Sequence, residues 1–266
     1  MEPTSNAGLA LVTGASSGIG FELARQFAEH SFDLVIAAED DDIAVAADDL
    51  EGLGGRVEVV QVDLATEQGV EELWRRTTAL GRPLDAAALN AGIGAGGAFA
   101  ETDLADELKL VDLNVRSTVH LAKHVAASMV DRGEGRILFT SSIASTMPGS
   151  FQAVYNAFKS FVQSFALALR NELKDSGVTV TSLMPGPTDT EFFERADMLD
   201  TKVGTGEKDD PADVARDGFE ALMDGDERVV SHSLKTKAQG RGSRALPDSV
   251  KAEMHRRMAE PGSAKR

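Results

Sequence analysis

The sequence predicts an α/β fold: a doubly wound parallel sheet of about seven strands in a single domain. Short apolar runs rich in β-branched residues alternate with longer segments of helical spacing about six times along the 266 residues. The runs are apolar throughout, which is typical of strands covered by helices on both faces. A glycine-rich turn follows the first run, and neither a linker nor an internal repeat divides the chain.

Each predicted strand is an apolar run bounded by polar or turn-forming residues. Runs of this length without polar alternation favour strands buried on both faces. In chain order, strands are predicted over residues 9–13, 34–37, 57–62, 86–89, 136–140, 178–183 and 228–231.

The segments between the strands have apolar residues three and four positions apart, as amphipathic helices do. Helices are predicted over residues 19–29, 43–53, 67–80, 103–131, 152–175 and 211–223. Asp210 precedes Pro211 as an N-cap before a proline at the first helical position, and Gly225 follows the last turn.

Two regions lie outside this alternation. Residues 188–209 are polar, lack periodicity and exceed the usual length of a connection, so we expect a lid or binding loop there. Residues 235–266 form a C-terminal extension to a catalytic domain over 1–234. We expect the extension to be irregular over 235–242 and helical over 247–258.

Composition excludes several classes of protein. The chain has no cysteine, which excludes disulfides, thiolate metal sites and a cysteine nucleophile. The start has no basic signal region, and no stretch reaches the roughly 18 apolar residues of a membrane span, so a cytoplasmic protein is expected. The five histidines are scattered in the sequence, and no cluster with metal-ligand spacing is expected, so no metal is predicted.

The charge is unevenly distributed. Residues 235–266 carry nine Lys/Arg and three Asp/Glu and contribute +6 to the net charge of −16. The acidic remainder disfavours nucleic acid and anionic membranes as partners. The basic extension is expected to dock on the acidic body or on a neighbouring subunit, with a nucleic-acid arm as the alternative.

The turn after the first strand has the composition of a phosphate-binding turn. Glycines there permit close approach of a pyrophosphate to a helix N-terminus, whereas a glycine-rich turn without a ligand is the alternative. The residues concerned are Gly14, Ser16, Ser17, Gly18, Ile19 and Gly20.

The ends of the next three strands carry further candidate cofactor contacts. Four acids at 39–42, beginning with Glu39, disfavour a 2′-phosphate and can accept hydrogen bonds from ribose hydroxyls, although a solvated helix start is an equal alternative. Asp63, before Leu64, is either an adenine acceptor or a helix N-cap. Asn90, Ala91 and Gly92 suit a turn beside a cofactor, or an ordinary turn.

The single tyrosine, Tyr155, stands four residues before Lys159, so the two share a helix face. A nearby ammonium is expected to lower the phenol pKa, although such pairs are common on helix surfaces. Ser142 follows a strand at the sheet edge where ligands bind. Asn114 lies among apolar residues as either a structural or a water-holding amide.

Together these motifs resemble the short-chain dehydrogenase/reductase family in its single-domain, Rossmann-like form, from about residue 9 to residue 230. The resemblance rests on their order and spacing: Thr13-Gly-x-x-x-Gly18-Ile-Gly20, Asp63, Asn90-Ala-Gly92, Asn114, Ser142, Tyr155-x-x-x-Lys159 and Pro185-Gly186.

The resemblance implies a role for each catalytic residue. Tyr155 is the general acid or base, Ser142 orients the substrate oxygen, Lys159 holds the nicotinamide ribose, and Asn114 helps hold a relay water. Residues after Pro185 and Gly186, namely Thr188 and Thr190, grip the carboxamide. It also implies a homotetramer or homodimer formed through the helices at 103–131 and 152–175.

One departure concerns the cofactor. The family's ribose-binding aspartate falls at Ala38, and Glu39 stands where NADP users often carry arginine. We therefore expect NAD(H), with Glu39 or Asp40 as the substitute, and NADP(H) stays open.

The expected function is interconversion of an uncharged secondary alcohol and a ketone. The small, apolar candidate pocket segments are 93–99, 143–152 and 192–193, and Arg195 and Lys202 are either pocket contacts or solvated loop charges. The alternatives are a 3-oxoacyl-carrier-protein reductase, which would need a basic patch at the site mouth, and a non-catalytic dinucleotide-sensing regulator.

Overall fold

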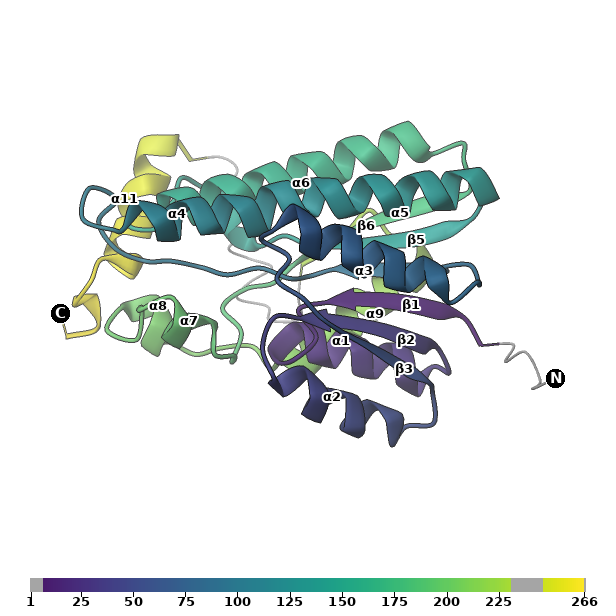
Figure 1. Cartoon of the computed structure of the whole chain (residues 1–266). Coiled ribbons are helices and arrows are strands. Elements are labelled where there is room, and N and C mark those ends of the chain that lie inside the picture. Colours follow the sequence, from purple (N-terminus) through teal and green to yellow (C-terminus); the bar gives the residue numbers. More distant parts are fainter. Residues whose placement is uncertain (1–6, 231–245, 266) are drawn as a thin grey trace.

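The computed structural model describes residues 7–230 and 246–265 (Figure 1). Seven parallel strands form one sheet in the order β3-β2-β1-β4-β5-β6-β7, which confirms the predicted fold class. The strands are β1 Leu9–Thr13, β2 Asp33–Ala38, β3 Val57–Gln61, β4 Ala86–Leu89, β5 Gly135–Thr140, β6 Val178–Met184 and β7 Arg228–Val230. Ser231, the last residue of the predicted final strand, lies outside the described residues.

Helices cover both faces of the sheet, as the uniformly apolar strands require (Figure 1). One apolar core lies under α3 Glu67–Ala79, α5 Thr118–Arg132 and α6 Ala153–Leu173. The other lies under α1 Gly18–Glu29, α2 Asp42–Glu51 and α9 Pro211–Asp224. Among the described helices, none combines the length and apolarity that crossing a bilayer requires.

The long helix expected over 103–131 is interrupted. It begins as α4 Leu104–Val111, widens into the π-helical segment η1 Asp112–Ser117 and continues as α5. The Asn114 amide donates to the Leu110 carbonyl oxygen at 2.9 Å, a side-chain bond to the helix backbone itself. Apolar spacing did not predict the interruption, because spacing carries no information on side-chain bonds such as this one.

Residues 188–209, expected to be aperiodic, contain two short helices, α7 Phe192–Arg195 and α8 Lys202–Thr205. A β-bridge between Thr188 and Asp209 closes the segment at its base. Met198 between the helices is fully buried. The segment is therefore a packed unit beside the carboxyl edge of the sheet rather than an open loop.

The expected C-terminal helix is present as α11 Asp248–Ala259, followed by the 3₁₀ turn η4 Ser263–Lys265. Ala259 packs with Phe193 and Met198 in a small apolar core of its own. The Ser150 hydroxyl donates to the Ala252 carbonyl at 3.0 Å. The helix is thus joined to the catalytic domain, while the segment 235–242 lies outside the described residues.

Candidate active site

A cleft of about 840 Å³ opens at the carboxyl ends of the strands, between the parallel neighbours β1 and β4, where the strand order reverses. Ligands of doubly wound sheets bind at this switch point. Every predicted cofactor residue lines the cleft: Gly14, Ser16, Ser17, Gly18, Ile19, Gly20, Glu39, Asp63, Leu64, Asn90, Ala91, Gly92, Tyr155, Lys159, Pro185, Gly186, Thr188 and Thr190.

The glycine turn leads directly into the N-terminus of α1. Gly18 has φ +56°, and a Cβ there would lie 2.9 Å from the Cγ2 atom of Thr190. At Gly20 a Cβ would lie 1.9 Å from the Gly14 carbonyl oxygen, so only glycine fits. The turn therefore presents backbone and a helix N-terminus to the cleft, as an anionic pyrophosphate requires.

The acids after β2 border the same cleft. Ser16 Oγ donates to Asp40 Oδ2 at 3.0 Å, and the other oxygen, Asp40 Oδ1, is buried without a hydrogen-bond partner. Glu39 is exposed, with Lys109 Nζ 3.5 Å from its carboxylate. A buried, unpaired carboxylate oxygen beside a phosphate-type turn is suited to accept a hydrogen bond from a ribose hydroxyl.

Asp63 is not the N-cap of α3, because Thr66 accepts the hydrogen bond from Gly69 N that defines this cap. Asp63 Oδ1 instead accepts from Ala65 N at 2.8 Å in a local turn, with the side chain lining the cleft. The alternative of a plain N-cap is therefore wrong.

Asn90 connects three adjacent strands at the cleft floor. Its amide donates to the Thr13 carbonyl at 3.1 Å and accepts from the Thr140 hydroxyl at 2.9 Å. Thr13 Oγ1 accepts from the backbone N–H groups of Asn90 and Ala91, each at 3.0 Å. These bonds fix the edge that Asn90, Ala91 and Gly92 present to a ligand.

Ser142 follows β5 and is buried at the cleft wall. Its hydroxyl caps the 3₁₀ turn at Ile143–Thr146 by accepting from Ala144 N at 3.1 Å. It lies 3.4 Å from the Pro185 carbonyl oxygen, to which it donates. Ser142 also acts to lower the pKa of Tyr155.

Tyr155 and Lys159 lie one turn apart near the start of α6, both lining the cleft. Lys159 Nζ donates to the Thr140 carbonyl at 2.8 Å, and burial lowers the lysine pKa to about 8. Burial also raises the pKa of Tyr155 to about 12, against the opposing effect of the Ser142 hydrogen bond. The shift is therefore opposite to the expected lowering of the phenol pKa by Lys159, because desolvation is the largest effect on this group.

Asn114 does not line the cleft but lies behind it in η1. Its amide donates to the Ile93 carbonyl at 3.1 Å and accepts from Ile93 N, also at 3.1 Å. With its further bond to Leu110, the side chain is satisfied by protein groups, as the structural alternative predicts. It fixes the segment that follows β4 at Ile93.

The 185–190 loop closes the cleft over the glycine turn. The Thr188 hydroxyl donates to the Gly186 carbonyl at 3.0 Å, and Thr190 Oγ1 accepts from Phe192 N at 3.3 Å. The methyl of Thr190 lies against Gly18. Two motifs about 170 residues apart in the sequence thus meet across one site.

Sequence reasoning missed the part of the wall that α11 supplies. His255 and Met258 line the cleft, and burial lowers the pKa of His255. Of the expected substrate segments, Phe99 is exposed outside the cleft, whereas Arg195 and Lys202 do border it. Nothing near Met258 in the sequence predicts this contact, since it depends on how the extension folds back.

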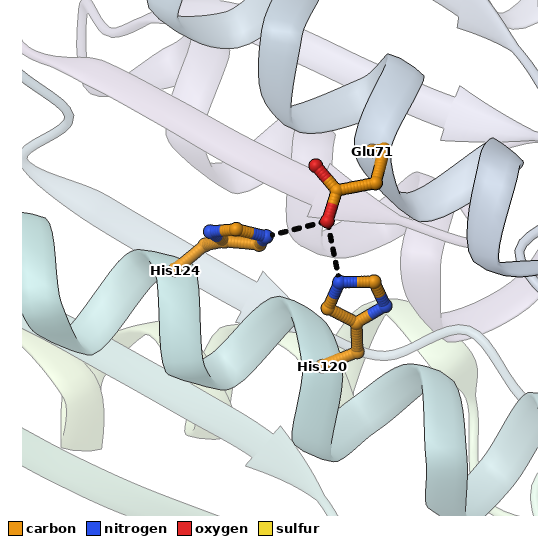
Figure 2. Close-up of side chains that lie close together, drawn as sticks. All are labelled: Glu71, His120 and His124. Atoms are coloured by element: carbon orange, nitrogen blue, oxygen red, sulfur yellow. Dashed lines mark hydrogen bonds and ion pairs between the residues drawn. The ribbon is translucent and has the colours of Figure 1, made fainter.

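The expectation that no histidine cluster has metal-ligand spacing is also wrong. His120 and His124 of α5 meet Glu71 of α3 outside the cleft (Figure 2). The sequence signal was the four-residue spacing of the two histidines on one helix.

Comparison with known proteins agrees with this architecture. The family model for short chain dehydrogenase matches residues 8–198. An uncharacterized oxidoreductase of Staphylococcus saprophyticus is 31% identical over 217 residues, covering 81% of this chain and 91% of that protein.

Two solved structures extend the comparison. A short-chain dehydrogenase from Sphingobium yanoikuyae in complex with NADPH has a TM-score of 0.79 at 28% identity, covering 89% of this chain and 93% of its own. A bulky-bulky ketone specific alcohol dehydrogenase from Comamonas testosteroni has a TM-score of 0.76 at 27% identity, with 90% and 92% covered. The chain belongs to the short-chain dehydrogenase/reductase family and is an NAD(P)-binding oxidoreductase.

Proposed function

We propose that this enzyme interconverts a secondary alcohol and a ketone, with Ser142, Tyr155 and Lys159 as its catalytic residues. The observation that carries the proposal is the convergence of these three side chains on one cleft with the glycine turn of α1. Three polar groups from β5 and α6 face a phosphate-type turn from β1, although they lie far apart in the sequence. Such a cleft can hold a dinucleotide and a carbonyl side by side.

The nicotinamide group, when bound, supplies or accepts the hydride. In the direction of reduction, the neutral Tyr155 phenol donates its proton to the oxygen of the substrate carbonyl. Ser142 donates a hydrogen bond to that oxygen and orients it. Lys159 holds the ribose hydroxyls of the nicotinamide half. Asn114 holds the loop at Ile93 in place from behind the cleft.

NAD(H) is the cofactor we favour, with NADP(H) as the alternative. Glu39 and Asp40 border the cleft where a ribose would lie, and both carboxylates repel a 2′-phosphate. The Sphingobium relative was solved with NADPH, so the family alone does not decide the preference. The unpaired Asp40 Oδ1 supports a free ribose hydroxyl as the missing donor.

The substrate we propose is an uncharged ketone or secondary alcohol. Apolar side chains border the cleft near Tyr155, among them Ile143, Met147 and Phe192, whose ring centre lies 5.2 Å from that of Tyr155. The Comamonas relative is named as an alcohol dehydrogenase specific for bulky-bulky ketones. Assaying a panel of ketones and alcohols with each cofactor tests the proposal. Turnover confined to charged acyl thioesters would contradict it.

A 3-oxoacyl-carrier-protein reductase remains the second candidate, because the basic extension does reach the cleft through α11. An acidic carrier protein would need unpaired cations at that mouth. The described cations of α11 are instead paired within the helix: Lys251 with Asp248, Arg256 with Glu260 and Arg257 with Glu253. This pairing argues against α11 as the docking surface for an acidic carrier protein, although Lys202 and Lys208 also border the cleft.

We also propose that the enzyme is a homodimer or homotetramer joined through α4–α5 and α6. Leu104, Leu108 and Val111 form a stripe on one face of α4, and Val119 and Phe161 are likewise exposed on α5 and α6. Exposed apolar stripes on adjacent helices suit a subunit interface. We expect this assembly to bind a small uncharged substrate. We expect neither nucleic acid nor a membrane as a partner.

A further inference from the structure

A second cluster of ligand-type side chains lies outside the catalytic cleft. Glu71 on α3 meets His120 and His124 on α5 (Figure 2). Glu71 Oε1 lies 2.7 Å from Nε2 of His120 and 3.0 Å from Nε2 of His124. The three ligand atoms all lie within 4.8 Å of one another. Two imidazoles and a carboxylate therefore converge on one point.

The backbone positions of this cluster are fixed by the core. Val70 and Leu73, on either side of Glu71, are buried in the same apolar core as Leu121 and Val125 of α5. An ion pair at 3.2 Å also joins Arg116 of η1, just before α5, to Glu67 at the start of α3. Ligands on packed helices are held more accurately than ligands on loops.

One imidazole ring is also held in orientation. The ring of Trp74, which follows Glu71 by three residues on α3, stacks on His124 with the ring centres 5.3 Å apart and the planes inclined by 12°. His120 and His124 are four residues apart and share one face of α5. The stacking holds the plane of the His124 ring, and the lone pairs of the ring nitrogens lie in that plane.

We propose that Glu71, His120 and His124 form a binding site for one divalent transition-metal ion, with Zn²⁺ as the best match. Two imidazoles and one carboxylate are a ligand set that Zn²⁺ favours, whereas Mg²⁺ and Ca²⁺ prefer oxygen ligands. The side chains of His120 and His124 are 25% and 30% exposed and that of Glu71 is 52% exposed, which leaves water access for a fourth ligand.

Binding replaces the two N–H···O hydrogen bonds. Each neutral imidazole moves its proton from Nε2 to Nδ1, and the freed Nε2 lone pair coordinates the ion. With Zn–N and Zn–O bonds of about 2.0 Å, tetrahedral geometry sets the N···O separations at about 3.3 Å. From the observed 2.7 and 3.0 Å, the two N···O separations therefore lengthen by about 0.6 and about 0.3 Å.

The site is separate from the hydride-transfer site, since none of its three residues lines the cleft. The ion would cross-link α3 to α5 on the outer layer and would act on stability. The chain has no cysteine, so zinc bound by this protein must use histidine and carboxylate ligands. The absence of cysteine leaves fewer candidate ligands to test by mutagenesis.

Calorimetric titration of the untagged full-length chain with Zn²⁺ tests the proposal. One ion per chain is expected, and thermal unfolding should shift upward with Zn²⁺ but not with Mg²⁺. Glu71→Gln and His124→Gln should each weaken Zn²⁺ binding by at least about 10- to 100-fold. That is the usual effect of losing a residue that only hydrogen-bonds to a metal ligand. His30→Gln, which removes a histidine outside the cluster, should leave affinity unchanged.

Circular dichroism without metal separates loss of the site from loss of the fold. A variant that keeps its metal-free melting curve but loses the Zn²⁺-induced shift supports the proposal. Should Glu71→Gln or His124→Gln weaken the metal-free fold, the single variant His120→Gln is titrated instead, at a temperature at which circular dichroism shows it to be folded. Wild-type affinity in the folded variants, or absence of Zn²⁺ binding by the wild-type chain, would overturn the proposal.

Discussion

The Lys159 ammonium lies 5.9 Å from the centre of the Tyr155 ring, yet the phenol pKa is raised rather than lowered. Burial dominates both groups: it raises the pKa of Tyr155 to about 12 and lowers that of Lys159 to about 8. In both cases the neutral form is favoured. Burial therefore favours the neutral Tyr155 phenol, which is the form that donates a proton in ketone reduction.

Titration of the phenol should reveal this state directly. Tyr155 is the only tyrosine in the chain, so phenolate absorbance reports it without background from other phenols. We expect a pKa above the ordinary value of 10.0, near 12. A midpoint at or below the ordinary value would show that Lys159 outweighs burial.

The pH dependence of turnover should follow from the same phenol. Alcohol oxidation needs the phenolate, so its rate should rise as the pH increases through the alkaline range. Ketone reduction needs the neutral phenol and should persist at neutral pH. Initial rates in both directions across pH check this, and oxidation fastest at acidic pH would contradict it.

Lys159 should make stability depend on pH. Its pKa is about 8 in the folded chain, against an ordinary value of 10.5. Between these values the unfolded chain binds the proton more tightly, so folding stability should rise with pH through this window, by about 3 kcal/mol at most. The measurement is the unfolding free energy of wild type minus that of Lys159→Met. A flat difference across the window would refute the effect.

The acids beside the ribose site should set the cofactor preference. Glu39→Arg replaces a cleft carboxylate by a cation that can pair with a 2′-phosphate, so kcat/KM should shift toward NADP(H) by at least about 10-fold. Asp42→Arg makes the same charge change just outside the cleft and is the matched control. An NADP(H) preference in the wild-type enzyme would refute the assignment.

The apolar stripe on α4 should hold the subunits together. Leu108 is 54% exposed, and Leu108→Glu should convert the assembly to monomers in sedimentation or light-scattering measurements. Val45→Glu changes an apolar residue on α2 that is 64% exposed and should leave the assembly intact. A wild-type chain that is monomeric at all concentrations would rule out this interface.

Much of the fold could be predicted because each strand is an apolar run and each cofactor motif follows the end of a strand. Asn114 shows the limit of this approach: its motif was evident, but the π-helical segment that holds it depends on side-chain bonds to Ile93 and Leu110. Met258 shows a second limit, because its place in the cleft wall depends on how the C-terminal extension folds. Glu71 meets His120 only because α3 packs on α5, a tertiary contact without a local signal.

Replacement of Tyr155 by Phe tests the central claim most directly, since it removes only the hydroxyl. Ketone reduction should fall by about 10²- to 10⁴-fold, the usual contribution of a positioned proton donor. Binding of NADH, followed by its fluorescence, should stay within a few fold of wild type. Turnover that survives the substitution would contradict the assignment of Tyr155 as the proton donor, and a wild-type chain that binds NADH without turning over any ketone would favour the sensing regulator.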